Sequence, residues 1–579
     1  MPNLQNFFPF LSETKDYKRE YLIRDLLAGL TLVIIAVPQV MSYAMVAGLP
    51  PIYGLYALAI PPIIGALWMR TGILSIGPIA IVSFLTYISI TPFAEPGTPE
   101  FISIAIVLAL LVGLIQLFVG IFRFGAIMRF ISNPVIIGFT NAAAIIIATT
   151  QVRHLLGIDV KRSDIIFEMF IEIGRNLIHT HIYTLGVGLL AFAFIIGGKK
   201  ISENFPGAMI AAIVTTIMAY LLNLRELGVR TVGEMPAGIP SLALTFISLE
   251  IIPHLIGPAL VIAVIGSTQL LAISKIVSAK AKQPLNMNQN LTGVGVANIT
   301  SFLFQSYPVS TSFPRSLVNM QAGAKTRVSV IFASVVVIIT LMFFTPLFYY
   351  LPNATLAAIV MAAVVGLIQH SQFIKLYKTN KQDGIVALIT FLFCLAIKPS
   401  YAIFIGAGAA LIIFLYESMA PRIITLTRNP KTETFENADI VRSPVCPQIL
   451  YLRPDFAIYF ANAEYIRENI IEKVMQKKNG LKYILLDMEA VNKIDTTGTD
   501  ELKTLIEELK NLNIQLYIAN VRTPVRDALR KAGIINLLEQ KGCLESKAES
   551  ITLLFNKIDH KYCRERCPHA VFWECETIK

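Results

Sequence analysis

Residues 305–327 read Gln305-Ser-Tyr-Pro-Val-Ser-Thr-Ser-Phe-Pro-Arg315-Ser-Leu-Val-Asn-Met-Gln-Ala-Gly-Ala-Lys325-Thr-Arg327, and they place hydroxyls, two prolines and an arginine inside an otherwise apolar chain. A helix that begins at Pro314 would put Lys325 about 15 Å further along, at about 1.5 Å per residue. That distance is about half of a hydrocarbon core of ~30 Å. With Lys325 and Arg327 at the headgroups, Arg315 is expected near the bilayer midplane.

An arginine at that depth is costly, and cations inside membranes generally mark a ligand or ion pathway. The free N–H groups at a helix start add partial positive charge beside the Arg315 guanidinium. A small anion is therefore the expected guest. The alternative is an interfacial re-entrant loop whose arginine snorkels to the headgroups.

The composition indicates a polytopic membrane protein followed by a soluble domain. Of the 579 residues, 55% are apolar and 15% are charged, and the mean hydropathy is +0.64. Such values exclude an ordinary soluble protein. The net charge of +11 lies largely in short loops between apolar runs. There it indicates orientation in the lipid bilayer, so nucleic acid is not expected as a partner.

Apolar runs predict fourteen spans, at about 25–46, 52–68, 74–91, 101–122, 131–151, 180–197, 205–222, 253–274, 289–304, 309–324, 328–349, 353–369, 383–397 and 400–419. Lysines and arginines gather in alternate loops, which predicts an even number of spans with both termini in the cytoplasm. We therefore expect a cytosolic segment over 1–24 and a multi-pass transmembrane domain over 25–427, in the cell inner (plasma) membrane.

The third span repeats the pattern of the tenth. Ser75-Ile-Gly77-Pro78 offers a second helix start after a flexible break, and the apolar run ends near Thr91. In the predicted topology the two half-helices run in opposite directions, so their positive ends converge. Paired Gly/Pro-broken segments indicate an inverted-repeat transporter with a central site. The alternative is that Gly77-Pro78 is an ordinary kink.

The first span supplies two polar side chains. Gln39 and Tyr43 are spaced i, i+4 and share a helix face, directly after Pro38. A glutamine amide can donate to an anion, and an aromatic edge can line its pocket. Interhelical hydrogen bonding is the other use of Gln39.

The tail is predicted to begin after a polar linker, 428–444, and to form one α/β domain over 445–558. Its most distinctive run is Ile494-Asp495-Thr496-Thr497-Gly498. A threonine at a helix start is expected to cap free N–H groups. Phosphorylation of Thr496 or Thr497, or anion binding at that helix start, is the regulatory alternative.

The final segment, 559–579, contains His560, Cys563, Cys567, His569 and Cys575. Their density is compatible with zinc, but the spacing is irregular. Reduced surface cysteines in a mobile tail are favoured, so neither a metal nor a cofactor is predicted.

These motifs resemble the SulP anion permeases, solute carrier family 26, over nearly the whole chain, and the tail resembles a STAS domain. The resemblance rests on Pro38-Gln39-Val-Met-Ser-Tyr43-Ala44, Gly48-Leu-Pro-Pro-Ile-Tyr-Gly-Leu-Tyr56, Ser75-Ile-Gly-Pro78, Asn298, Ser312-Phe-Pro-Arg-Ser-Leu-Val-Asn319, Ala322-Gly-Ala-Lys325 and Ile494-Asp-Thr-Thr-Gly498. It implies a seven-plus-seven inverted repeat of 14 spans with core and gate domains, usually dimeric, and an elevator-type mechanism. The anion-site residues predicted from the motifs and the resemblance together are Gln39, Tyr43, Gly77, Pro78, Ile79, Ser312, Phe313, Pro314, Arg315 and Ser316.

The sequence departs from the family pattern at positions that matter for coupling. Many members have serine at the position of Pro314, and proton-linked members often carry a glutamate where this chain has Gln269. A second family acid is replaced by Asn290. Because neither amide titrates, exchange, facilitated movement or sodium linkage is expected in place of proton symport.

The predicted function is secondary transport of a small inorganic anion, with sulfate first and bicarbonate or chloride next. A homodimer and a cytosolic partner at the STAS domain are also expected. The alternatives are a nucleobase permease of the same architecture and an anion-binding sensor or motor without net transport. No enzyme is predicted, because the sequence presents no nucleophile and base, metal-ligand or phosphate-loop constellation.

Overall fold

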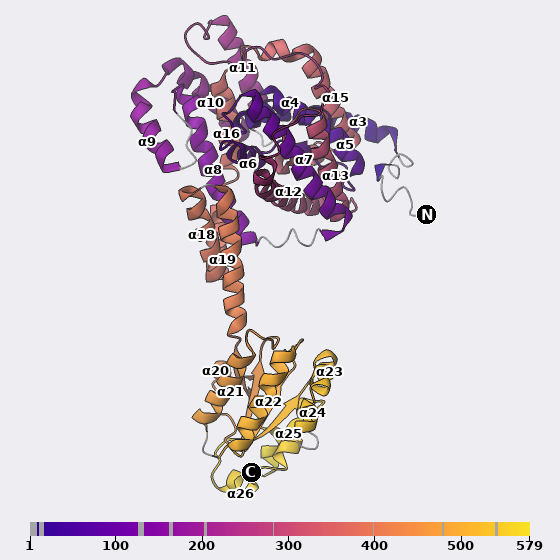
Figure 1. Ribbon diagram of the computed structural model, residues 1–579, viewed down its shortest axis with the longest axis vertical. Helices are drawn as coiled ribbons and strands as arrows, with labels where there is room; N and C mark the ends of the chain where they lie inside the picture. The colour runs from indigo at the N-terminus through magenta and orange to yellow at the C-terminus, as the bar shows by residue number, and fades with distance from the viewer. Residues whose placement is uncertain are drawn as a thin grey trace. The chain divides into compact units, whose positions relative to one another are not determined.

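The computed structural model describes residues 9–10, 17–124, 132–160, 166–201, 205–281, 283–397, 399–477, 480–538 and 542–578. Most of the predicted N-terminal segment, residues 1–8 and 11–16, lies outside these ranges. The chain divides into two units, Met1–Ala410 and Leu411–Lys579. The boundary falls within helix α19, Pro399–Met419 (Figure 1).

Unit 1 is built from apolar helices, because a backbone surrounded by lipid must satisfy its own N–H and C=O groups. Seven helices among the described residues are long and apolar enough to cross a membrane, or eight if the bent pair Ile166–His179 and Ile182–Gly198 counts as one span. Each predicted span coincides with a helix or a pair of short helices. These are α3 (Arg19–Val46), α4 (Ile52–Ala59) with α5 (Pro61–Trp68), α6 (Ala80–Ile90), α7 (Pro99–Ile121), α8 (Asn133–Leu156), α10 (Ile182–Ile201), α11 (Gly207–Leu221), α12 (Ile252–Ala281), α13 (Met287–Leu303), α14 (Phe313–Gln321), α15 (Val328–Ile339), α16 (Asn353–Val365), α18 (Lys381–Ala396) and α19.

The helices of unit 1 pack in two groups (Figure 1). Helices α3 to α7 and α12 to α15 contact one another, while α8, α10, α11, α16 and α18 form a second set. Helix α3 contacts α11 and α16, and α6 contacts α8, so these two helices join the groups. This arrangement agrees with the core and gate domains expected for the inverted-repeat fold. Two additional helices, α9 (Ile166–Asn176) and α17 (His370–Thr379), lie between predicted spans.

Two short strands bring the half-helices together. Strand β1 (Ile76–Gly77) precedes α6 and β2 (Ser310–Thr311) precedes α14, and the strands pair antiparallel, Ile76 opposite Thr311. The predicted convergence of the two helix starts is therefore confirmed. It is reinforced by Ser312, whose backbone N–H donates to the Ser75 carbonyl at 2.9 Å.

Unit 2 is a six-stranded sheet covered on both faces. The strand order is β4-β3-β5-β6-β7-β8, and β5 to β8 run parallel, joined by helical crossovers. The strands are β3 (Ile423–Arg428), β4 (Phe435–Asn437), β5 (Ile449–Pro454), β6 (Tyr483–Asp487), β7 (Gln515–Ala519) and β8 (Cys543–Leu544). One apolar core involves α21 (Ala463–Gln476), α22 (Thr496–Asn511), α23 (Thr523–Lys531) and α24 (Ile534–Leu537). A second core involves α25 (Lys547–Phe555), α26 (His560–Glu565) and the 3₁₀ turn η6 (Trp573–Thr577).

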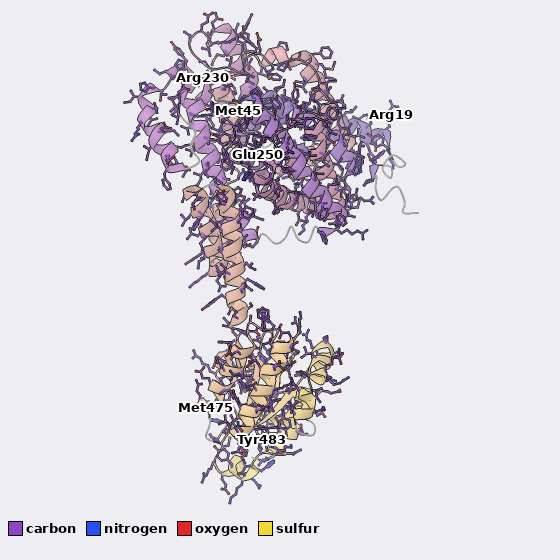
Figure 2. All side chains as sticks on the ribbon, viewed as in Figure 1. Arg19, Met45, Arg230, Glu250, Met475 and Tyr483 are labelled. Atoms are coloured by element: carbon purple, nitrogen blue, oxygen red, sulfur yellow. The ribbon has the colours of Figure 1, made fainter. Side chains whose placement is uncertain are left out.

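Two predictions about the tail differ from the structure. The stretch expected as a linker, 428–444, contains β4 and α20 (Ala438–Val441), and β4 pairs with β3. The last segment, expected as a mobile tail, contains α26 and η6, which pack against the sheet. Figure 2 shows the side chains of both units. Met45 is buried in unit 1, and Tyr483 is the first residue of β6 in unit 2.

Candidate functional site: a buried arginine between two helix starts

Arg315 is held at the start of α14. Ser312 is the N-cap residue, and its hydroxyl accepts the Arg315 backbone N–H at 3.5 Å. Pro314 stands in the first turn, where its missing N–H costs nothing. The Arg315 side chain is 0% exposed. The alternative of a snorkelling arginine is therefore wrong for this structure.

The Arg315 guanidinium is unpaired within the described part of the chain. Its Nε, Nη1 and Nη2 atoms all lack a hydrogen-bond partner within the described part of the chain. By contrast, Nη1 of buried Arg327 donates to three carbonyls at the end of α5, including that of Ala66 at 2.7 Å. A buried charge without partners is strongly disfavoured unless something else compensates it. Arg315 is therefore the candidate anion-binding residue of unit 1.

The first span reaches this site as predicted. The Gln39 Nε2 atom donates to the Tyr43 hydroxyl at 2.9 Å, which confirms that the two side chains share a face of α3. The Tyr43 phenol lies close enough to Arg315 to interact with it electrostatically. The Gln39 Oε1 atom is buried, with no hydrogen-bond partner in the described structure.

Gly77 allows the close approach of the two half-helices. Its φ of +148° is one that side-chain-bearing residues rarely adopt. A Cβ atom at this position would come within 2.9 Å of the Arg315 Nη2 atom. The absence of a side chain therefore leaves room for the guanidinium beside β1.

The remaining predicted site residues divide by burial. Pro78, Ile79, Ser312 and Ser316 are buried, whereas the Phe313 and Pro314 side chains are exposed. The Ser316 hydroxyl accepts the Ser75 backbone N–H at 3.0 Å. The structure thus brings the buried residues to the joint between the two half-helices and leaves Phe313 and Pro314 at its margin.

Three polar groups at this joint were missed from the sequence. Tyr307 is fully buried, lies near Arg315, and has its hydroxyl 3.3 Å from that of Ser83. The hydroxyls of Ser75, just before β1, and Thr311, on β2, are buried without a partner in the ranges described. Tyr307 belongs to the polar stretch 305–327, and this position was the available signal for it.

The two predicted coupling positions differ in their surroundings. Gln269 is half-buried on α12. Asn290 is fully buried, and its Oδ1 atom accepts the Arg70 and Thr71 backbone N–H groups at 2.9 and 3.1 Å. Its Nδ2 atom donates to the hydroxyls of Thr71 and Ser274. Asn290 is therefore a structural clamp that requires both a donor and an acceptor.

A buried carboxylate near the start of α3 was also missed. Asp25 is 0% exposed and accepts the backbone N–H groups of Lys325 and Thr326 at 2.7 and 3.1 Å. It also accepts the Thr326 hydroxyl at 2.5 Å. It lies outside the centre of the span, so it does not supply the central acid sought from the sequence.

In unit 2, the helix after Ile494 is capped by aspartate rather than by threonine. The Asp495 Oδ1 atom accepts the Gly498 N–H at 2.8 Å, and its Oδ2 atom accepts the Phe460 N–H at 2.9 Å. The Thr496 and Thr497 side chains are exposed. The prediction of a threonine cap is therefore wrong, and both hydroxyls face solvent.

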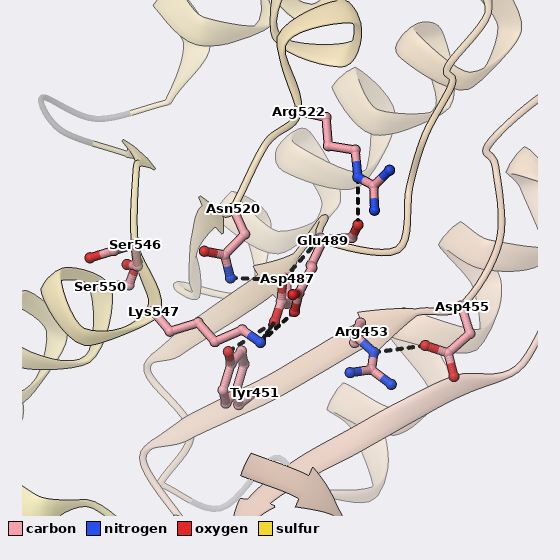
Figure 3. Close-up of polar contacts among 10 residues, drawn as sticks. All are labelled: Tyr451, Arg453, Asp455, Asp487, Glu489, Asn520, Arg522, Ser546, Lys547 and Ser550. Carbon is pink, nitrogen blue, oxygen red and sulfur yellow. Dashed lines mark hydrogen bonds and ion pairs between the residues drawn. The ribbon is translucent and has the colours of Figure 1, made fainter. Parts of the chain in front are cut away.

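A polar cluster lies at the carboxyl ends of the parallel strands (Figure 3). Buried Asp487 accepts hydrogen bonds from the Tyr451 hydroxyl and the Asn520 amide, both at 3.0 Å, and Lys547 lies 3.5 Å from it. Burial and the Asp487 carboxylate together raise the pKa of Tyr451. Lys547 also donates to Glu489 and holds the pKa of that carboxyl below its usual value. Each charge has partners, so this cluster is structural.

Comparison with known proteins supports the two units separately. The model of the sulfate permease family matches residues 22–390, and the STAS domain model matches residues 441–546. The chain is 33% identical over 591 residues to the probable sulfate transporter 4.2 of Arabidopsis thaliana, covering 99% of this chain and 87% of that protein. It is 32% identical to the chloroplastic sulfate transporter 4.1 of the same plant, covering 92% and 80%.

Solved structures show the same fold. The murine solute carrier 26 family member A9 anion transporter, in an inward-facing state, matches with a TM-score of 0.87 and 23% identity over 96% of this chain and 94% of that chain. The transmembrane domain of a cyanobacterial bicarbonate transporter matches with a TM-score of 0.59 and 21% identity, covering 68% and 98%. The chain therefore belongs to the sulfate permease family of membrane anion transporters and ends in a STAS domain.

Proposed function

We propose that this protein moves sulfate across the membrane and binds it at Arg315. The observation that carries the proposal is a fully buried guanidinium without a partner among the described residues, at the joint of two converging helix starts. The cation, the helix N-termini and the free hydroxyls of Ser75 and Thr311 are all donors suited to oxygen atoms. A tetrahedral oxyanion can use several of these donors at once.

The relatives' names favour sulfate among the small inorganic anions, because both Arabidopsis proteins are called sulfate transporters. Bicarbonate and chloride are the competing cargoes. The anion crosses without chemical change, so we propose no enzymatic activity. The cycle we propose is an elevator-type movement of the α3–α7 and α12–α15 group against the second group, in a homodimer of the plasma membrane with cytoplasmic termini.

The STAS domain is proposed as a regulatory or assembly unit with a cytosolic partner. The support is its own double-sided core, which is complete without unit 1. Thr496 and Thr497 are exposed at a helix start, where added phosphate would be electrostatically favourable.

The test is radiolabelled sulfate uptake into proteoliposomes. Arg315→Ala should lower uptake about 10- to 100-fold, because hydrogen bonds to a charged group contribute about 1.5–3 kcal/mol. The matched control is Arg230→Ala, because Arg230 (labelled in Figure 2) is exposed and its Nη2 atom lies 2.6 Å from the Asp159 Oδ2 atom in a surface ion pair. Both variants should insert and fold.

The remaining outcomes separate the alternatives. Excess unlabelled bicarbonate or chloride should inhibit the uptake of labelled sulfate less than unlabelled sulfate does. A reversed order would make the stronger inhibitor the proposed substrate. Anion binding without flux would make the protein a sensor. Normal uptake by Arg315→Ala would remove Arg315 from the site.

A further inference from the structure

Four of the six cysteines line one space in unit 2. The space has a volume of about 10 Å³, enough for about one water-sized group, and its wall includes Cys446, Cys563, Cys567, Cys575 and His569. The rest of the lining is isoleucine and valine. Cys446, Cys563 and Cys575 are buried and Cys567 is half-buried. The expectation of reduced surface cysteines is therefore wrong for Cys563 and Cys575.

The four thiols come from two distant parts of the chain. Cys446 precedes β5, whereas Cys563 lies on α26, Cys567 follows that helix, and Cys575 lies on η6. All six cysteines of the chain are free. The fourth cysteine of this space, Cys446, stands far upstream of the other three. No local sequence motif therefore connects it with them.

N–H groups lie beside two of the sulfurs. The backbone N–H groups of Gln448 and Ile449 lie near the Cys446 sulfur and favour its thiolate form. The Gln448 Nε2 atom donates to the Cys563 Sγ atom at 3.3 Å. Such donors stabilise a thiolate and fix its orientation, as outer partners do around bound metals. Cysteines that only fill a core need no such donors.

Burial raises the pKa of the Cys446 and Cys563 thiols and so favours their protonated form. Burial raises the pKa of Cys446 to about 12, although the two backbone N–H groups oppose that shift. Among the described residues, no group of three or more His, Cys, Asp or Glu side chains is already arranged to hold a metal ion. Binding therefore requires the thiols to turn inward. Each sulfur is carried by one rotatable χ1 bond, which lets it turn.

We propose that Cys446, Cys563, Cys567 and Cys575 bind one zinc ion as four thiolates. Four sulfur ligands suit the tetrahedral preference of zinc. On binding, each thiol releases one proton to solvent and forms one Zn–S bond, and no electron is transferred. The ion would fasten α26 and η6 to the start of β5 and so lock the second core of unit 2.

The first experiment measures zinc in full-length protein purified in detergent with reductant. Wild type should carry about one zinc ion per chain. The double variant Cys563→Ser/Cys575→Ser should carry almost none. Cys543→Ser is the matched control and should retain the ion, because Cys543 lies on β8 of the same domain but outside the space.

The second experiment needs no substitution and therefore does not depend on folding of a variant. Zinc removal by a chelator should expose the four thiols to alkylation, and added zinc should protect them again, with Cys543 unchanged. Equal alkylation with and without zinc, zinc-free wild-type protein, or full zinc content in the double variant would overturn the proposal. Iron with acid-labile sulfide, or a disulfide between these cysteines, would overturn it as well.

Discussion

Two buried arginines on neighbouring segments show how partners determine the role of one side chain. The Arg327 guanidinium donates hydrogen bonds to the carbonyls at the end of α5, and a cation in that position stabilises a helix C-terminus. Arg315 has no such partner among the described residues. The same residue type is thus structural in one place and available for a ligand in the other.

Gly77→Ala should impair anion binding without unfolding the protein. The new methyl group would press on the Arg315 Nη2 atom at 2.9 Å and on the Leu58 Cδ1 atom at 3.0 Å. A loss of about 1.4 kcal/mol would raise the half-saturating concentration about tenfold. Gly97→Ala is the control, because Gly97 has a φ of +83° and nothing within 4 Å of its Cβ position. An equal effect of both substitutions on uptake would assign the loss to backbone strain alone.

Asn290→Asp should destabilise unit 1 and should not create proton coupling. An ionised carboxylate cannot donate to Thr71 and Ser274, so the buried clamp loses two bonds, at a cost of about 1–3 kcal/mol. Thermal unfolding of the detergent-purified protein measures this cost. Gln269→Glu, at a half-buried position, is the comparison and should unfold closer to wild type. Proton-driven uptake by Asn290→Asp would contradict the structural role.

Some of these residues were predictable and others were not. Arg315, Gln39 and Tyr43 stand out because polar groups are rare in apolar spans. Tyr307 was missed because it stands between two predicted spans, where a tyrosine looks like an ordinary loop residue, and Asp25 was missed because an acid at a span end looks like a solvated one. Only the fold shows that both are buried.

At the scale of single elements, glycine and proline gave the best guidance. The breaks at Ser75-Ile-Gly77-Pro78 and Phe313-Pro314 predicted both half-helices, since Pro314 stands in the first turn of α14 and Pro78 just before α6, where a missing N–H costs no helix bond. Strand β4 was overlooked because it has only three residues and is reached through a polar turn, so the stretch 428–444 resembled a linker. Strand β3 was overlooked because it follows the last span directly and lay almost entirely within the bounds predicted for the transmembrane domain, and its second partner, β5, stands further along the chain.

Helix α22 provides a test at this scale. Asp495→Ala should remove the cap of α22 and the tie to Phe460, at a cost of about 1 kcal/mol. Hydrogen exchange in the first turn of α22 should therefore speed up in the full-length protein. Thr496→Ala, at an exposed position, should leave the exchange rate unchanged. Equal exchange rates in the two variants would show that Asp495 does not cap α22.

For the whole molecule, the place of a truncation should decide its effect. Removal of 421–579 takes away the complete sheet, so transport should continue with the same order of competing anions. Removal of 445–579 leaves β3 and β4 without β5 and exposes an unpaired strand edge that favours aggregation. Expression and size-exclusion profiles of the two truncations measure this difference. A changed anion order in the shorter protein would place unit 2 in the permeation path.

The pairing of β1 with β2 has a thermodynamic consequence. Main-chain hydrogen bonds join the two halves of the repeat beside Arg315, so in the proposed elevator cycle both helix starts would move as one piece when the site changes sides. The anion then meets the same donors on either side of the membrane. Such a carrier can run in either direction, and any difference in half-saturation between the two faces would then reflect the populations of the inward- and outward-facing states rather than different contacts to the anion. The electrochemical gradients of the transported ions, rather than the protein, then set the direction of net transport.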